Sequence, residues 1–190
     1  KKKINIYNKK NLVGFATRNI PHRGHEKIIL KFIKNRNMLI HIMEDASNNK
    51  KINSNITLNA YKKFIEKNKI KKNVILKKIT APSFLLGSRQ AALHALIAKN
   101  LKCKYFIIGR DHSGYKNFYG EFESYEFCKK NEKKLGIKII ESGSPQFCIK
   151  CNKVVFRNEC KCKKSSYDIS STLIRSMKKT SDKKKLTNFL

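Results

Sequence analysis

The chain has 190 residues, of which 40% are apolar and 30% are charged, and its formal net charge is +31. This length fits one α/β domain with at most a small appendage, and the apolar content is enough to build a core, which excludes a disordered chain. No apolar run approaches the roughly 20 residues of a membrane span and no signal-peptide pattern opens the sequence, so we expect a cytoplasmic protein that does not enter a membrane.

Lysine supplies most of the positive charge, with 37 Lys against 7 Arg. The lysines are spread along the whole sequence, which favours a compositional bias over a selected nucleic-acid surface. Arginine is more informative, because its planar fork binds anions through two hydrogen bonds. Five arginines fall in the motifs described below: Arg18, Arg23, Arg89, Arg110 and Arg175.

Short apolar runs alternate with amphipathic segments. Buried strands are predicted at 11–16, 38–43, 74–79, 104–109 and 137–141, and helices at 22–34, 58–68 (capped by Thr57), 87–99 and 122–134. This alternation predicts an α/β fold, a Rossmann-like parallel sheet with helices on both faces. His41, inside the second strand, is expected to be a core histidine with its hydrogen bonds satisfied.

The pattern breaks near residue 145. We expect residues 1–145 to form the α/β core and residues 146–164 to form a small inserted knuckle. Residues 165–190, with a helix over 170–179, are expected to complete the core.

The first motif follows the first predicted strand and opens the first predicted helix. It contains His22-Arg23-Gly24-His25, of the form HxGH. Two histidines three positions apart share one side of a helix N-terminus, where free N–H groups and the helix dipole attract phosphate. Gly24 lets a nucleotide approach the backbone closely. The motif therefore predicts a nucleotide site.

Two further motifs carry polar groups to the same region. Residues 169–175, ISSTLIR, open the last predicted helix with hydroxyl groups that can bind phosphate, although an ordinary helix cap has the same pattern. Residues 109–114, GRDHSG, follow a buried strand. The carboxyl ends of parallel strands meet at one edge of a sheet, so we expect residues 17–25 and 110–114 to share that edge.

Four cysteines lie close together in the sequence, at Cys148, Cys151, Cys160 and Cys162. Four thiolates with this spacing predict a tetrahedral, structural Zn²⁺ site, with disulfides or cysteines that have no common role as the alternatives. Cys103 and Cys128 are expected to be small core residues.

The pairing of HxGH with ISSTxxR resembles the nucleotidyltransferase α/β superfamily. TRNxxHRxHE, GSRQAALHA (87–95), GRDHSG and the cysteine cluster occur in the same order as in the ATP sulfurylase (sulfate adenylyltransferase) family, over residues 12–178. The resemblance implies that Mg²⁺-bound ATP reacts with sulfate to give adenylyl sulfate and pyrophosphate. These small molecules are the expected partners, without nucleic acid, and a homodimer is the assembly to look for.

The resemblance also implies roles for single residues. The implied catalytic residues are Thr17, Arg18, Asn19, His22 and His25. The same five and Gly109, Arg110, Asp111, His112, Ser171 and Thr172 are implied nucleotide contacts. Arg18 is the implied sulfate clamp, and Ser113 lies beside sulfate. Arg89, Gln90 and His94 are further candidates for lining the nucleotide pocket.

The chain departs from the usual family forms at several positions. Ala16 stands where Gln is usual, Ser88 where Pro is usual, and Ser113 where Ala is usual. These differences leave two alternatives open. One is a related adenylyl- or cytidylyltransferase with another anionic acceptor, and the other is a non-catalytic protein that binds nucleotides or nucleic acids.

Overall fold

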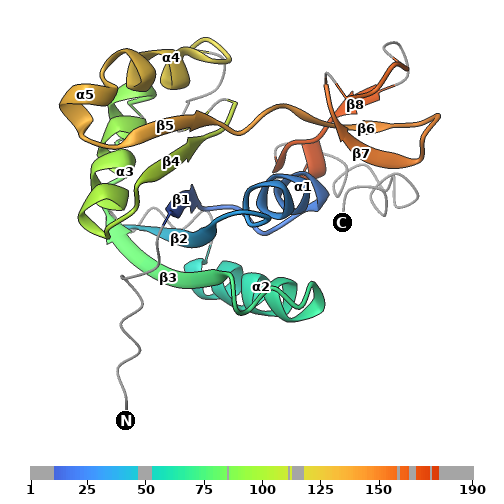
Figure 1. Ribbon diagram of the computed structural model, residues 1–190, viewed down its shortest axis with the longest axis horizontal. Coiled ribbons are helices and arrows are strands. Elements are labelled where there is room, and N and C mark those ends of the chain that lie inside the picture. The colour runs from blue at the N-terminus through green and yellow to red at the C-terminus, as the bar shows by residue number, and fades with distance from the viewer. Residues whose placement is uncertain are drawn as a thin grey trace.

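The central feature of the fold is a sheet of five parallel strands (Figure 1). The computed structural model describes residues 11–46, 53–84, 86–110, 112, 118–157, 159–162, 166–171 and 173–175. The strands are β1 (Leu12–Thr17), β2 (Asn37–Asp45), β3 (Val74–Ala81), β4 (Tyr105–Ile108) and β5 (Lys138–Glu141), in the order β3-β2-β1-β4-β5. The order reverses between β1 and β4, and ligands of open α/β sheets bind beyond the carboxyl ends of the strands at such a point.

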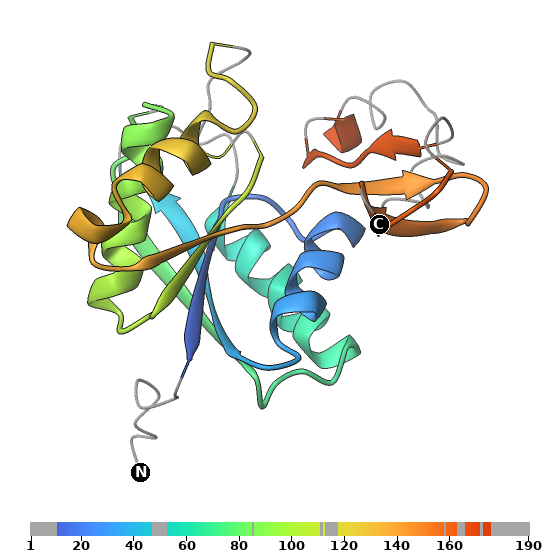
Figure 2. The same cartoon turned by 45° about the horizontal axis from the view of Figure 1, so that its top comes forward.

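Helices cover both faces of this sheet (Figures 1 and 2). α1 (Arg23–Phe32) and α2 (Ser54–Lys67) lie on one face, and α3 (Ser88–Asn100), α4 (Glu123–Lys130) and α5 (Glu132–Leu135) on the other. Side chains of β1 alternate between them: Val13 and Phe15 pack with α1, and Leu12 and Ala16 with α3. The predicted fold class is confirmed. None of the described helices has the length and apolar character needed to cross a bilayer.

Two predicted helices have different bounds. α2 begins at Ser54, four residues before the predicted start, because Asn53 accepts a hydrogen bond from the Asn55 N–H at 2.9 Å and caps the helix. Thr57 is not a cap but a buried residue of the first turn. The predicted helix 122–134 is divided at Asn131 into α4 and α5. The spacing of apolar residues cannot reveal a first helical turn made of polar residues or a short break within a helix.

The cysteine-rich segment belongs to a second, antiparallel sheet that was not predicted. It consists of β6 (Pro145–Cys148), β7 (Lys153–Phe156) and β8 (Ser166–Asp168), in the order β7-β6-β8. β6 and β7 lie against α1 (Figure 1), where the Lys31 ammonium is 4.2 Å from the centre of the Phe156 ring. Strands of three or four residues are too short to show a period of two. The three predicted segments, 1–145, 146–164 and 165–190, stay a prediction.

Candidate active site

The turn between β1 and α1 holds the first motif. The Thr17 hydroxyl oxygen accepts a hydrogen bond from the Asn19 N–H at 3.1 Å, which closes a tight turn. The Thr57 hydroxyl donates to the Arg18 carbonyl at 3.3 Å and ties the turn to α2. Because the backbone is held in this way, the side chains of Arg18 and Asn19 have a defined place at the carboxyl edge of the sheet.

His22 and His25 stack at the N-terminus of α1, with ring centroids 3.9 Å apart. His22 caps the helix, its Nδ1 accepting from the Gly24 N–H at 3.2 Å. Burial lowers the pKa of His22 to about 4. Burial, and then the neighbouring His22, bring the pKa of His25 well below its ordinary value. Both rings are therefore neutral near pH 7 and offer N–H groups rather than positive charge.

A side chain at position 24 would be crowded at this end of α1. A Cβ there would lie 3.0 Å from the His22 ring and 3.3 Å from the Ile169 side chain. Ile169 begins the ISSTLIR motif, so the two motifs meet at this point. Among the described residues, neither the buried His25 Nδ1 nor the buried Ser171 Oγ has a hydrogen-bond partner. Unpaired buried polar atoms are costly, and a bound ligand, ion or water molecule would satisfy them.

A hydrogen bond joins the same two motifs directly. The Arg175 guanidinium donates to Asn19 Oδ1 at 3.3 Å, across 156 positions of the sequence. Desolvation lowers the pKa of Arg18, Asp45 opposes this shift, and Arg175 adds to it. Two guanidinium groups that repel one another at one edge of a sheet form an arrangement that an anion would stabilise. Thr172, from the same motif, lies outside the described residues.

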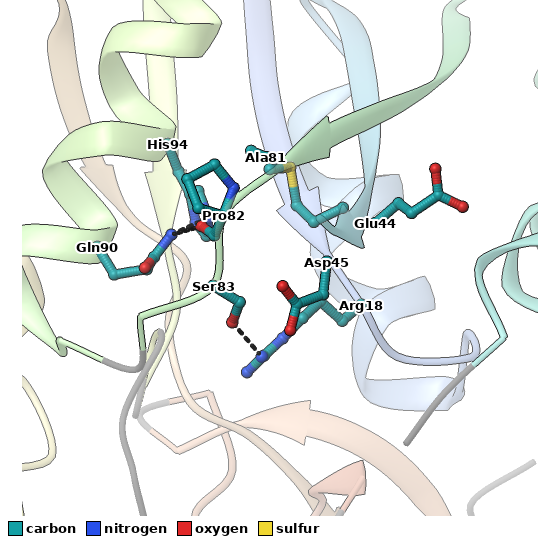
Figure 3. A pocket seen from close by; sticks show the side chains of 9 residues that line it. Arg18, Glu44, Asp45, Ala81, Pro82, Ser83, Gln90 and His94 are labelled. Atoms are coloured by element: carbon teal, nitrogen blue, oxygen red, sulfur yellow. Dashed lines mark hydrogen bonds between the residues drawn. The ribbon is translucent and has the colours of Figure 1, made fainter. Parts of the chain in front are cut away.

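Arg18 also lines a pocket at the ends of β2 and β3 (Figure 3). Its guanidinium donates to Ser83 Oγ at 3.1 Å and lies beside the Asp45 carboxylate. The other lining residues are Met43, Glu44, Ala81, Pro82, Gln90 and His94. Glu44 accepts hydrogen bonds from Ser54, Lys78 and Thr80, which lower its pKa to about 2. The Glu44 carboxylate is thus ionised at neutral pH and oriented by three protein donors.

Two of the three further candidates on α3 reach this pocket. Gln90 and His94 are buried and line it, whereas Arg89 is exposed and does not. His94 Nδ1 lies 3.2 Å from His112 Nε2, which connects the pocket to the loop after β4. His41 is a core residue, as predicted, but neither of its ring nitrogens has a partner within the part of the chain that is described.

The loop after β4 brings Arg110 to the same edge. The Arg110 guanidinium pairs with the Asp168 carboxylate at 2.8 Å and with Glu121 at 3.5 Å. The sequence pattern did not single out Asp168; the one available signal was its place directly before Ile169. Gly109 and His112 lie in the same loop, and Asp111 and Ser113 lie outside the described residues.

The four predicted metal ligands converge. Sγ–Sγ distances are 3.5 Å for Cys148 and Cys160, 3.6 Å for Cys151 and Cys160, and 3.9 Å for Cys151 and Cys162. A tetrahedral zinc ion with Zn–S bonds of about 2.3 Å would place its sulfurs about 3.8 Å apart. The cluster therefore has the geometry to hold a metal ion. Cys103 and Cys128 are buried, as predicted.

Comparison with known proteins identifies the family. The family model described as ATP-sulfurylase matches residues 1–184. The chain belongs to the ATP sulfurylase family. Its relatives include the sulfate adenylyltransferase of Carboxydothermus hydrogenoformans, 34% identical over 80% of this chain and 41% of that protein. The sulfate adenylyltransferase of Persephonella marina is 30% identical over 91% of this chain and 46% of that protein.

This ATP sulfurylase family member spans less than half the length of these two relatives. Its structure resembles that of a hexameric APS kinase from Thiobacillus denitrificans, with a TM-score of 0.62. That match covers 90% of this chain and 32% of the other, at 16% sequence identity. At this identity the likeness supports the fold alone.

Proposed function

We propose that this chain carries the site at which sulfate attacks the α-phosphorus of ATP to give adenylyl sulfate and pyrophosphate. The observation that carries the proposal is the Asn19–Arg175 hydrogen bond, which joins the two motifs predicted to bind phosphate. Membership of the ATP sulfurylase family and the names of the relatives support it.

The reaction needs little covalent chemistry from the protein. A sulfate oxygen forms a bond to the α-phosphorus, the bond from that phosphorus to the bridging oxygen breaks, and its electron pair leaves with pyrophosphate. Sulfate is already an anion at neutral pH, so no general base has to remove a proton. Positioning and neutralisation of negative charge are therefore the main requirements.

The proposed roles follow from the charge state of each group. Arg18, with Ser113, would hold sulfate, while Arg175 would neutralise the triphosphate. His22 accepts at Nδ1, so its Nε2 carries the proton and would donate to a phosphate oxygen. The other proposed catalytic residues are Thr17, Asn19 and His25. The proposed nucleotide contacts are Gly109, Arg110, Asp111, His112, Ser171 and Thr172.

Metal ions would serve two separate purposes. Mg²⁺ would arrive with the ATP phosphates and needs only one or two carboxylates, for which Asp45 beside Arg18 is suited. When bound, it neutralises charge on the leaving pyrophosphate. We propose Zn²⁺ for Cys148, Cys151, Cys160 and Cys162, since four thiolates leave no open coordination position and so make the site structural.

Pyrophosphate release from Mg-ATP, with sulfate, molybdate or neither added, tests the reaction. Molybdate imitates sulfate but forms an unstable adenylyl adduct, so it draws the reaction forward. We expect release that depends on the oxyanion, its near-complete loss in Arg18→Ala, and no loss in Arg36→Ala, a matched control at the opposite end of the sheet. ATP binding without release under either condition would instead favour another acceptor.

The alternative of a nucleic-acid-binding protein makes a separate prediction. Binding through +31 of net charge would depend steeply on salt. We expect no retention of DNA or RNA in a gel-shift assay at about 150 mM salt. Specific retention at that salt concentration would favour the alternative.

A further inference from the structure

A chain of hydrogen bonds runs beneath the pocket, from the backbone after β3 to His112. It starts at Gln90, in the first turn of α3. Gln90 Nε2 donates to the Pro82 carbonyl at 3.1 Å, and its Oε1 accepts from the Phe84 N–H at 2.9 Å. A carbonyl oxygen can only accept and a backbone N–H can only donate. The two backbone groups therefore fix which way the Gln90 amide faces.

The orientation of this amide determines the tautomer of His94. Gln90 Nε2 lies 3.1 Å from His94 Nε2. An amide nitrogen has two protons to donate and does not accept, so His94 Nε2 must be the acceptor. Burial, and then Arg18, lower the pKa of His94 to about 4, which keeps the ring neutral. A neutral ring with an unprotonated Nε2 carries its proton on Nδ1.

The same argument extends to His112. His94 Nδ1–H lies 3.2 Å from His112 Nε2 and donates to it. Burial is the main reason that the pKa of His112 is lowered to about 3, with smaller effects of His94 and Arg18. His112 is thus neutral as well, with its proton on Nδ1. The Ser124 hydroxyl donates to the His112 carbonyl at 2.9 Å and holds the backbone of this residue.

We propose that Gln90 and His94 are positioning residues that fix His112 as its Nδ1–H tautomer and join the loop after β3 to the loop after β4. Ser83, the partner of Arg18, lies between the two backbone groups that Gln90 binds. The relay therefore connects Arg18 to His112 through α3. Its role in catalysis rests on the proposed function, whereas the tautomer assignment does not.

Ring ¹⁵N NMR of the full chain near pH 7 tests the assignment directly. The chain has five histidines, and His22 is an internal reference because its Nδ1 accepts from Gly24, which requires the opposite tautomer. We expect an unprotonated Nε2 on His94 and His112 and a protonated Nε2 on His22. A protonated Nε2 on His94 in the unmodified protein would overturn the relay, without any variant having to fold.

The variant Gln90→Glu reverses the first hydrogen bond. A carboxylate only accepts, so His94 Nε2 has to become protonated, either in the other tautomer or as the imidazolium. We expect the His94 Nε2 signal to move into the protonated range while the His22 signals stay in place. Arg89→Gln makes the same change of charge, −1, one position away on the exposed side of α3, and it should leave His94 unchanged.

Kinetics separate the relay from the proposed function. We expect Gln90→Glu to lower kcat/KM for pyrophosphate release on the order of 10-fold or more, because small displacements of positioning groups are expensive. A tautomer change with unchanged kinetics would overturn the positioning role. If the unmodified chain releases no pyrophosphate, the proposed function fails, and the NMR result still decides the relay.

Discussion

Asn19 and Arg175 show how single side chains complete this site. Each residue lies in a short motif with an ordinary structural explanation, a turn in one case and a helix cap in the other. Their hydrogen bond, and the electrostatic effect of Arg175 on Arg18, concentrate positive charge at the N-terminus of α1. The neutral His22 and His25 add donors there without adding repulsion.

At the residue scale, Arg18 allows a test of geometry against charge. Arg18→Lys keeps the charge but removes the planar fork that holds Ser83. We expect pyrophosphate release to fall by about 10²-fold, the usual cost of losing one donor to a developing charge. Equal rates in Arg18→Lys and the unmodified protein would show that a point charge suffices.

His41 is the residue whose expected hydrogen bonds are not found among the described residues. A buried imidazole without partners costs about 1–3 kcal/mol, and leucine has a similar size. We expect His41→Leu to leave the free energy of unfolding in urea unchanged or raise it by about 1 kcal/mol, with ATP binding unaffected. Clear destabilisation would mean that the ring has a partner, such as a buried water molecule.

At the element scale, β8 matters because it brings Asp168 to Arg110. β8 pairs with β6, and Gln146 on β6 donates to Asp168 Oδ1 at 2.8 Å. The carboxylate is thus held on one side while it binds the guanidinium at 2.8 Å on the other. A strand of the second sheet therefore orients a side chain at the edge of the first.

Asp168→Asn should weaken this support while keeping the shape of the side chain. We expect the Kd for ATP, measured by calorimetry, to rise on the order of 10-fold, since the ion pair with Arg110 becomes a hydrogen bond to a neutral amide. Lys27→Ala, which removes the 3.1 Å ion pair between α1 and Glu159 in the segment after β7, is the control and should have little effect. Unchanged affinity in Asp168→Asn would contradict the role of β8.

We expect a metal ion at the cysteine cluster to stabilise the second sheet. We expect one zinc ion per chain by elemental analysis and a strong reduction in Cys160→Ser. Removal of zinc by a chelator should speed amide hydrogen exchange in β6 and β7 and leave β1 and β2 protected, because the cluster joins only the second sheet and its loops. A zinc content near zero in protein prepared without chelator would refute the assignment.

At the scale of the whole molecule, all five histidines share one property. Burial lowers the pKa of each, to about 4 for His22 and His94 and about 3 for His41 and His112, and well below the ordinary value for His25. In the unfolded chain these groups titrate near about 6.5. Below that pH the unfolded state binds more protons than the folded state, so acid favours unfolding.

We therefore expect the free energy of unfolding to fall as the pH drops from about 6.5 to about 4, by up to about 1.4 kcal/mol per pH unit for each histidine. Urea unfolding at a series of pH values measures this. Carboxylates such as Glu44 lower the stability only at more acidic pH. Their pKa is lower in the folded state, so the stability that they give is lost as the pH falls below their pKa in the unfolded chain. A flat profile between these limits would mean that the histidines are not buried as neutral rings.

Short sequence patterns by themselves determined much of the fold and part of the candidate site. The alternation of apolar strands with amphipathic helices determined the parallel sheet and its flanking helices, and the spacing of four cysteines predicted the cluster that could hold a metal ion. The placement of residues 17–25 with Arg110 and His112 at one edge followed as well, because parallel strands all end on the same side. Each of these features depends on residues that are near one another in the sequence.

Other features of the site were decided only by the tertiary structure, because they depend on how helices and strands pack together. The hydrogen bond from Arg175 to Asn19 and the ion pair of Asp168 with Arg110 join elements far apart in the chain. The contact between His94 and His112 joins α3 to the loop after β4. Side chains at one spacing can form a cap, a surface or a site, and no local pattern distinguishes these outcomes. Only the docking of α3 across the sheet and of β8 beside β6 brings the partners within hydrogen-bonding distance.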